Sequence, residues 1–163
     1  MENRIEPAAA ERRAAHAVSI VTIDRMPRQP TLAAQVVRAL ADRGISIDGL
    51  VGGWRNQREQ LVITVPVEEA ALVVELAGTI AARFGVGPVT VDSSWTELVI
   101  DVPRGRSSSA IVAELYEQLA ERNVEARAVT ATSNEVLCVV RPEAGDELRR
   151  SMTLRETKRR ARS

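Results

Sequence analysis

The sequence predicts an α+β protein made of two similar units, each an antiparallel sheet with two helices on one face. Two observations predict this class. Up to Val91, the spacing of the apolar residues predicts the elements strand, helix, strand, strand, helix and strand, in that order. The order then begins again at Leu98. Because a unit of about 75 residues has a small core, the units are expected to bury surface against each other or against a second chain.

The first helix is predicted over 32–43, between Pro30 and Gly44. Proline is tolerated at a helix start because the first amides have no helical partners. Glycine readily takes the left-handed conformation that ends a helix. A strand over 18–23 enters the loop before this helix, and a second strand is predicted over 45–54. The apolar stripe of the helix comprises Leu32, Ala33, Val36, Val37 and Leu40.

The first unit continues with a third strand over 61–65 and a second helix that Glu68 and Glu69 open. Gly85 ends this helix, and a fourth strand follows at 89–91. The expected buried stripe of the second helix comprises Leu72, Val73, Leu76, Ile80 and Phe84.

The second unit repeats this pattern. A strand over 98–102 leads to a helix with the stripe Ile111, Val112, Leu115, Tyr116 and Leu119. That helix ends in Leu119-Ala-Glu-Arg-Asn-Val124, which matches Leu40-Ala-Asp-Arg-Gly-Ile45 by residue type. A strand at 136–140 and a helix from Pro142 to Met152 complete the unit. The expected division is an N-terminal arm 1–16, a first domain 17–94, a second domain 95–152 and a basic, disordered tail 153–163.

Composition excludes several classes of protein. The formal net charge is zero, and no apolar run reaches the roughly 20 residues of a membrane span. Cys138, the one cysteine, lies in an apolar run and is interpreted as a core residue, which fits a reducing cytoplasm. His16 has no acid, nucleophile or metal-ligand cluster near it in the sequence, so neither catalysis nor a metal or cofactor is predicted.

Other readings of single features are weaker. An RNA-recognition module needs paired aromatic residues on central strands, and this chain has one Tyr, one Phe and two Trp. Ser107–Ser109 is interpreted as a helix cap rather than a phosphate site. Trp54 and Trp95 are interpreted as packing or interface residues. The basic tail is read as a solvated end, with contact to an acidic partner or nucleic acid as the alternative.

The chain resembles the tandem ACT-domain regulatory region of bacterial aspartate kinases, especially the actinobacterial type. The resemblance covers about residues 17 to 152, and the kinase domain is missing. It implies two ferredoxin-like βαββαβ domains that bind an amino-acid effector. The matching segments are Val21-Thr-Ile-Asp-Arg-Met-Pro-Arg-Gln-Pro30, Leu40-Ala-Asp-Arg-Gly-Ile-Ser-Ile-Asp48, Val62-Ile-Thr-Val65, Val91-Asp-Ser-Ser-Trp-Thr-Glu-Leu-Val-Ile100 and Thr132-Ser133.

The resemblance places the effector between the loop before the first helix of one domain and the second strand of its pair. The family's loop carries Asp before Pro-Gly, where this chain has Arg28 and Thr31, and Ser46 replaces the Asn of an Asn-x-Asp that keeps Asp48. In the second unit, Ser107–Ala110 stands for the family's His-Pro-Gly. The implied effector-binding residues are Met26, Arg28, Gln29, Pro30, Thr31, Leu32, Ser46, Ile47 and Asp48.

Two functions are therefore open. The first is a cytoplasmic, non-catalytic, homodimeric sensor that binds an amino acid and regulates a catalytic chain of aspartate-kinase type. The alternative is a degenerate ACT scaffold that mediates protein association without a ligand. Neither a membrane nor a nucleic acid is an expected partner.

Overall fold

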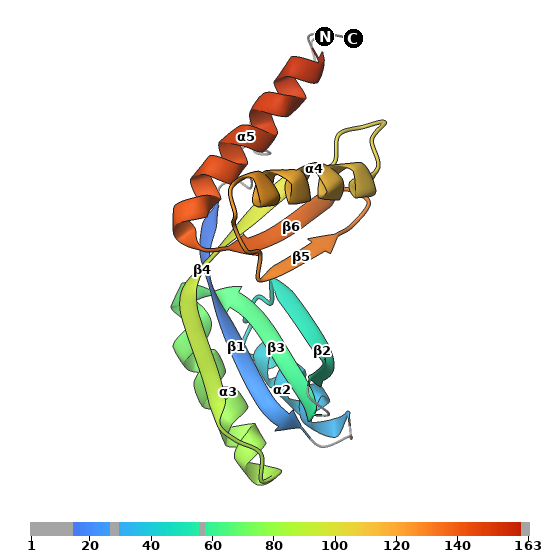
Figure 1. The fold of residues 1–163 in the computed structure, drawn as a ribbon. Helices are drawn as coiled ribbons and strands as arrows, with labels where there is room; N and C mark the ends of the chain where they lie inside the picture. Colours follow the sequence, from blue (N-terminus) through green and yellow to red (C-terminus); the bar gives the residue numbers. More distant parts are fainter. Residues whose placement is uncertain (1–14, 27–29, 56–57, 161–163) are drawn as a thin grey trace, which may run out of the picture. The chain divides into compact units, whose positions relative to one another are not determined.

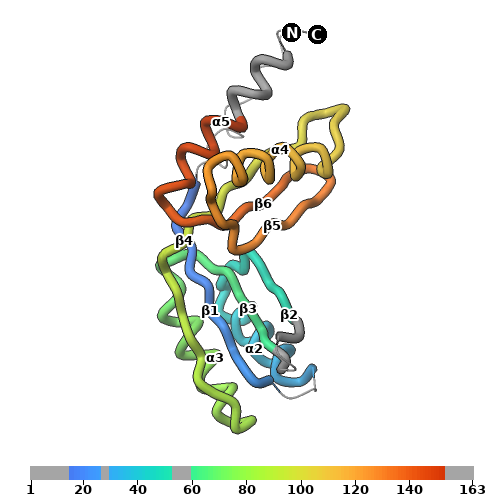
Figure 2. Tube along the Cα trace, in the orientation of Figure 1, coloured from blue at the N-terminus to red at the C-terminus, as the bar shows by residue number. Residues whose placement is uncertain are grey.

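The computed structural model shows strands and helices mixed along the chain, as the α+β prediction requires (Figure 1). It describes residues 15–26, 30–55 and 58–160, without the side chains of 53–55, 58–59 and 153–160 (Figure 2). Hydrogen bonds join the strands in the order β2-β3-β1-β4-β6-β5. The elements are β1 His16–Met26, α2 Thr31–Asp42, β2 Gly49–Arg55, β3 Arg58–Pro66, η1 Val67–Glu69, α3 Ala70–Arg83, β4 Val89–Asp101, α4 Ser108–Glu121, β5 Ala128–Ala131, β6 Glu135–Val140 and α5 Pro142–Arg160.

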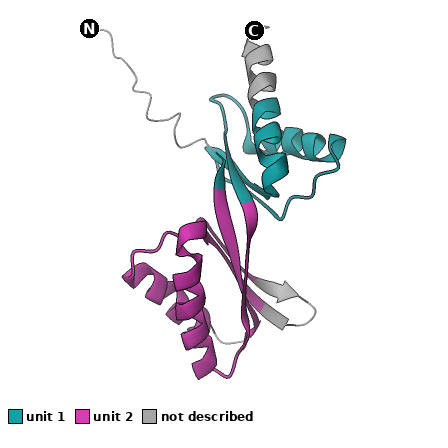
Figure 3. Cartoon of the chain, turned by 90° about the vertical axis from the view of Figure 1, so that its left-hand side faces the viewer, with its two compact units in different colours: residues 1–16, 96–163 teal, residues 17–95 magenta. Residues whose placement is uncertain are grey.

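The chain forms two compact units (Figure 3). Unit 2 comprises Ala17–Trp95, and unit 1 comprises Met1–His16 together with Thr96–Ser163. Strand β4 contributes residues to both units over its 13 residues. The sequence predicts two separate strands here, at 89–91 and 98–102, because polar residues lie between them. The backbone hydrogen bonds of a strand do not depend on apolar side chains, so the strand is continuous.

Unit 2 has the βαββαβ order of a ferredoxin-like fold. Strand β3 is antiparallel to both β1 and β2. Both helices lie on one face of the sheet (Figure 3), and their buried residues share one core with strand residues such as Val21 and Ile63. The predicted stripe of α2 is confirmed at Leu32, Val36 and Leu40, which are fully buried.

Helix α3 packs with a face that differs from the predicted stripe. Val73 and Ile80 are buried as predicted, whereas Leu72, Leu76 and Phe84 are only partly buried at the edge of the core. The remaining buried positions of α3 are the alanines Ala70, Ala77 and Ala81. The prediction followed the bulkiest side chains, but a close-packed interior can equally be lined by small ones.

Unit 1 combines the second part of β4 with α4, β5, β6 and α5. Its core contains the predicted α4 residues Ile111, Leu115 and Leu119. Tyr116, which was also assigned to the core, has an exposed fraction of 53%. Cys138 is completely buried, and this burial raises the pKa of its thiol to about 12, which confirms it as a core residue.

The C-terminal part of the chain also differs from the prediction. A disordered tail was expected from residue 153, but α5 continues to Arg160. Residues 153–160 contain neither glycine nor proline, and Glu156 precedes Arg160 by four positions, an order that favours a helix. High charge is therefore no obstacle to helix here. Of the expected N-terminal arm, residues 1–14 lie outside the described residues.

The duplication is visible just before the edge strands β2 and β5. The backbone N–H of Asp48 donates to the carbonyl of Thr64 in β3 at 2.9 Å, and that of Arg127 donates to the carbonyl of Val139 in β6 at 2.8 Å. In each hairpin the same acceptor residue faces the first residue of the edge strand. Asp48 and Arg127 therefore hold equivalent positions in the two units.

Helices α2, α3 and α4 end in the same way. The residue beyond the last turn is left-handed, with φ of 69° at Gly44, 66° at Gly85 and 51° at Asn123. The next residue in each case donates its N–H to a carbonyl of the last turn, which is the Schellman arrangement. The matched sequences at the ends of α2 and α4 thus form matched structures.

The conformation of Gly44 makes a testable prediction. Gly44→Ala is expected to lower the free energy of unfolding by about 1 kcal/mol, because a Cβ disfavours positive φ. An added Cβ there meets no atom within 4 Å, so backbone strain alone decides whether the free energy of unfolding falls or rises. Gly78→Ala in α3, where a Cβ also has open space, is the control and should raise stability by about 1 kcal/mol. Urea unfolding followed by circular dichroism measures both; equal signs would contradict the account.

Candidate functional site

The predicted site residues form two groups within unit 2. One group, Met26, Pro30, Thr31 and Leu32, lies where β1 leads into α2. The other, Ser46, Ile47 and Asp48, lies between α2 and β2. Arg28 and Gln29 lie outside the described residues.

The start of α2 offers backbone N–H groups to a ligand. Pro30 is the N-cap residue and has no side-chain acceptor, and its carbonyl accepts the N–H of Ala34 at 2.9 Å. The first turn contains no acidic residue. Thr31 is exposed, whereas Leu32 is buried and fixes the helix on the sheet. Within the described residues, no side chain caps this helix start. The start of a helix suits a carboxylate, because its first amides and the helix dipole both favour negative charge.

The start of α4 in unit 1 is different. Ser107 is the N-cap residue, and its Oγ accepts the N–H of Ala110 at 3.3 Å. The prediction that these serines cap a helix is thereby confirmed. At α4 the chain's own side chain satisfies an N–H of the first turn, whereas no described side chain does so at α2.

A bulge shapes the chain just before the start of α2. The pairing of β1 with β3 shifts between Ile23 and Met26, and Arg25 within the bulge has φ 61°. A positive φ strains the backbone of an arginine, and strained residues of this kind are often found near functional sites. Beside it, the side chain of Gln60 donates a hydrogen bond to Asp24.

The second group is not part of a strand, which corrects the prediction of a strand over 45–54. Residues 45–48 are irregular, and β2 begins at Gly49. The Schellman end of α2 redirects the chain here, so Ile45 is buried and Ser46 is exposed. Asp48 is partly buried and is held by its backbone bond to Thr64.

The register of the sheet separates the two groups. Met26 faces Glu59, whereas Ile20 faces Thr64, the residue to which Asp48 is bonded. Because a strand rises about 3.3 Å per residue, positions 20 and 26 are about 20 Å apart. One unit 2 therefore does not bring its helix start and its Asp48 onto one small ligand.

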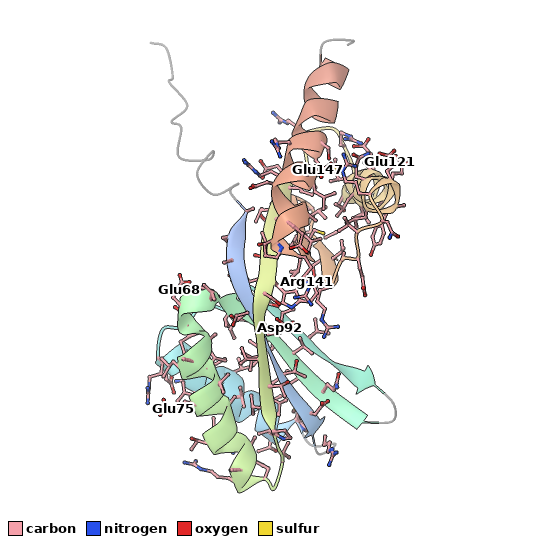
Figure 4. The ribbon with its side chains drawn as sticks, turned by 60° about the vertical axis from the view of Figure 1, so that its left-hand side comes forward. Glu68, Glu75, Asp92, Glu121, Arg141 and Glu147 are labelled. Atoms are coloured by element: carbon pink, nitrogen blue, oxygen red, sulfur yellow. The ribbon has the colours of Figure 1, made fainter. Side chains whose placement is uncertain are left out.

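Side-chain pairs in unit 1 were not predicted. Arg106 pairs with Glu114, and His16 Nε2 lies 3.2 Å from Glu97 Oε2. Arg122 joins α4 to α5, with its guanidinium 3.7 Å from Glu121 and 3.2 Å from Glu147, both labelled in Figure 4. Isolated arginines and glutamates at these spacings carry no sequence signal, so pattern reasoning had no means of finding them.

The geometry defines a chain of two related α+β units, of which unit 2 has the ferredoxin-like order. No known protein-family profile and no curated protein sequence matches the chain. Solved structures do match. The regulatory subunit of aspartate kinase from Thermus thermophilus, in a ligand-free form, is 20% identical with a TM-score of 0.75, covering 86% of this chain and 94% of that one.

Two further structures extend this finding. A structure of aspartokinase alpha and beta subunits is 17% identical with a TM-score of 0.71, over 84% of this chain and 95% of that chain. Aspartokinase III of E. coli, in complex with lysine and aspartate, is 14% identical with a TM-score of 0.61, over 85% of this chain but 31% of the enzyme.

The chain thus has the fold of an aspartate kinase regulatory region without the kinase domain, and the resemblance seen in the sequence is confirmed. The chain covers 94% of the Thermus thermophilus regulatory subunit and 95% of the matched chain in the structure of alpha and beta subunits. Among the described residues, no helix is long and apolar enough to cross a membrane.

Proposed function

We propose that the chain is a non-catalytic regulatory subunit that binds an amino acid and controls a biosynthetic enzyme of aspartate-kinase type. The observation that carries this proposal is its likeness to a separate regulatory subunit over 86% of its length. The neighbour with alpha and beta subunits supports association with a catalytic chain. The neighbour in complex with lysine and aspartate supports an amino acid as the ligand. A cytoplasmic location follows from such a role.

The proposed site joins the α2 start of one unit 2 to the segment before β2 of a second copy. The open amides of the α2 start would bind the effector carboxylate, and Asp48 would bind its ammonium group. Because Arg28, Thr31 and Ser46 differ from the residues of the resembling family, the effector is expected to be an amino acid other than lysine or threonine, or to bind weakly.

Completion of the site by a second copy requires a homodimer. Edge strand β2 presents Leu50 and Val51, with exposed fractions of 47% and 58%, beside Gly49 and Gly52. An exposed apolar edge is a surface for strand pairing. The dimer is expected to bury upwards of about 1,000 Å² in total. Light scattering should give twice the chain mass at tens of micromolar; a monomer there would count decisively against the proposed site.

The scaffold alternative remains a second candidate because unit 1 lacks two features of the proposed site. Arg127 occupies the position of Asp48 there, and Ser107 caps the helix start. If unit 2 also binds no amino acid, the remaining function of the fold is protein association.

Thermal unfolding with each proteinogenic amino acid separates the two functions. At least one amino acid is expected to raise the melting temperature, because a ligand that binds the folded state stabilises it by mass action. The same screen on Asp48→Asn, which keeps the shape and removes the charge, should show a smaller shift. No shift with any amino acid would favour the scaffold.

A further inference from the structure

The helix start of unit 1 is capped, whereas no described side chain caps the helix start of unit 2. The loop before α4 forms a turn in which the N–H of Arg106 donates to the carbonyl of Pro103 at 3.0 Å, with Gly105 at φ 85°. Ser107 then caps the helix. The loop backbone is therefore fixed by contacts within unit 1.

A bidentate ion pair fastens this loop to the helix. Arg106 Nη1 lies 3.1 Å from Glu114 Oε2, and Nη2 lies 2.7 Å from Oε1. Only 20% of the arginine side chain and 17% of the glutamate side chain are exposed. Two parallel charge-assisted hydrogen bonds in a mostly buried place are strong and directional.

Unit 2 lacks the residues for such a pair. The matched helix ends, Leu40 in α2 and Leu119 in α4, equate Glu114 with Gln35 and Arg106 with Pro27. Neither of these unit 2 residues carries a charge. The ion pair is thus a property of unit 1 alone within the duplication.

We infer that the Arg106–Glu114 pair is a latch that orders the loop before α4 without a ligand, whereas the α2 start of unit 2 is stabilised by the effector. In the proposed site of unit 2, the effector brings its carboxylate to the start of α2 and its ammonium group to Asp48 of a second copy. In unit 1 the loop supplies the cation and the helix supplies the carboxylate, so the two satisfy each other. Arg127, in place of Asp48, also removes the acid that would hold an ammonium group. Each chain therefore has one regulated unit and one unit whose loop is ordered without ligand.

The part of the inference that concerns the effector in unit 2 rests on the proposed function. The part that concerns the ion pair in unit 1 does not. Hydrogen–deuterium exchange of the full chain tests the latch without any ligand. In the parent, the amides of 106–111 should be protected. Glu114→Gln should raise their exchange rate about tenfold, since the charge-assisted hydrogen bonds from Arg106 give way to weaker bonds to a neutral amide. Glu117→Gln, the same change on an exposed position of the same helix, should have no effect.

A charge swap separates the latch from simple loss of packing. The double variant Arg106→Glu/Glu114→Arg should regain much of the protection that each single variant loses. Unchanged exchange in Glu114→Gln, or no recovery in the double variant, would overturn the latch.

Adding the amino acid that raises the melting temperature most tests the second half of the inference. It should slow exchange at the α2 start, 30–34, and leave 106–111 unchanged in the parent. Equal slowing in both loops would overturn the inference, because unit 1 would then also respond to ligand. Slowing in neither loop with any amino acid would count against the proposed function, while the ligand-free measurement still decides the latch.

Discussion

Replacing Leu40 with alanine is expected to lower the free energy of unfolding by about 2–5 kcal/mol. Leu40 is fully buried in the core of unit 2, and its carbonyl accepts two N–H groups beyond the helix end, from Arg43 and Ile45. The substitution removes apolar contacts and leaves a cavity that the packed core cannot close fully. Val67→Ala, at a side chain with an exposed fraction of 39%, is the control and should cost less than about 1 kcal/mol.

The duplication sharpens this prediction. Leu119, the equivalent residue of α4, is 4% exposed, and its carbonyl accepts the N–H of Val124 at 2.9 Å. Leu119→Ala should destabilise unit 1 as Leu40→Ala destabilises unit 2. Urea unfolding combined with amide exchange shows which unit is affected. A loss below about 1 kcal/mol in either variant would contradict the core assignment.

Asp48→Ala is expected to weaken binding of the amino-acid effector by about tenfold to a hundredfold, the range of a hydrogen bond to a charged group. Its carboxylate is the proposed partner of the ligand ammonium group. Calorimetric titration of the parent, Asp48→Ala and Arg28→Ala measures the effect.

Arg127→Ala is the matched control for this prediction, because Arg127 holds the equivalent place in unit 1 and should leave affinity unchanged. Tight binding of lysine or threonine that persists in both Asp48→Ala and Arg28→Ala would show that the site lies elsewhere.

Much of the fold could be predicted because the apolar spacing is strong where helices and strands are long. The helix stops at Gly44 and Asn123 reveal the duplication, since few residues tolerate positive φ. The four-residue strand β5 is too short for a periodic signal. The buried face of α3 was misjudged because alanines carry weak apolar signals. Helix α5 continues to Arg160 through residues 153–160, which contain no glycine or proline, so helix propensity favours the extension.

The site was less accessible to sequence reasoning. The spacing of Met26 and Asp48 along the chain does not show that they lie at opposite ends of one sheet, which depends on the register with Glu59 and Thr64. The resemblance supplied the residues, and the register shows that the two groups lie apart within one unit 2. The latch between Arg106 and Glu114 depends on side-chain placement that no motif encodes.

The central claim is that unit 2 carries an amino-acid site which unit 1 lacks. Nuclear magnetic resonance titration of the labelled full chain with the amino acid that stabilises it most tests this claim directly. The account predicts shifts in the amide signals of Thr31, Leu32 and Asp48, with those of Ala110 and Arg127 unchanged. Shifts confined to Ala110 and Arg127, or no saturable shift with any amino acid, would contradict it.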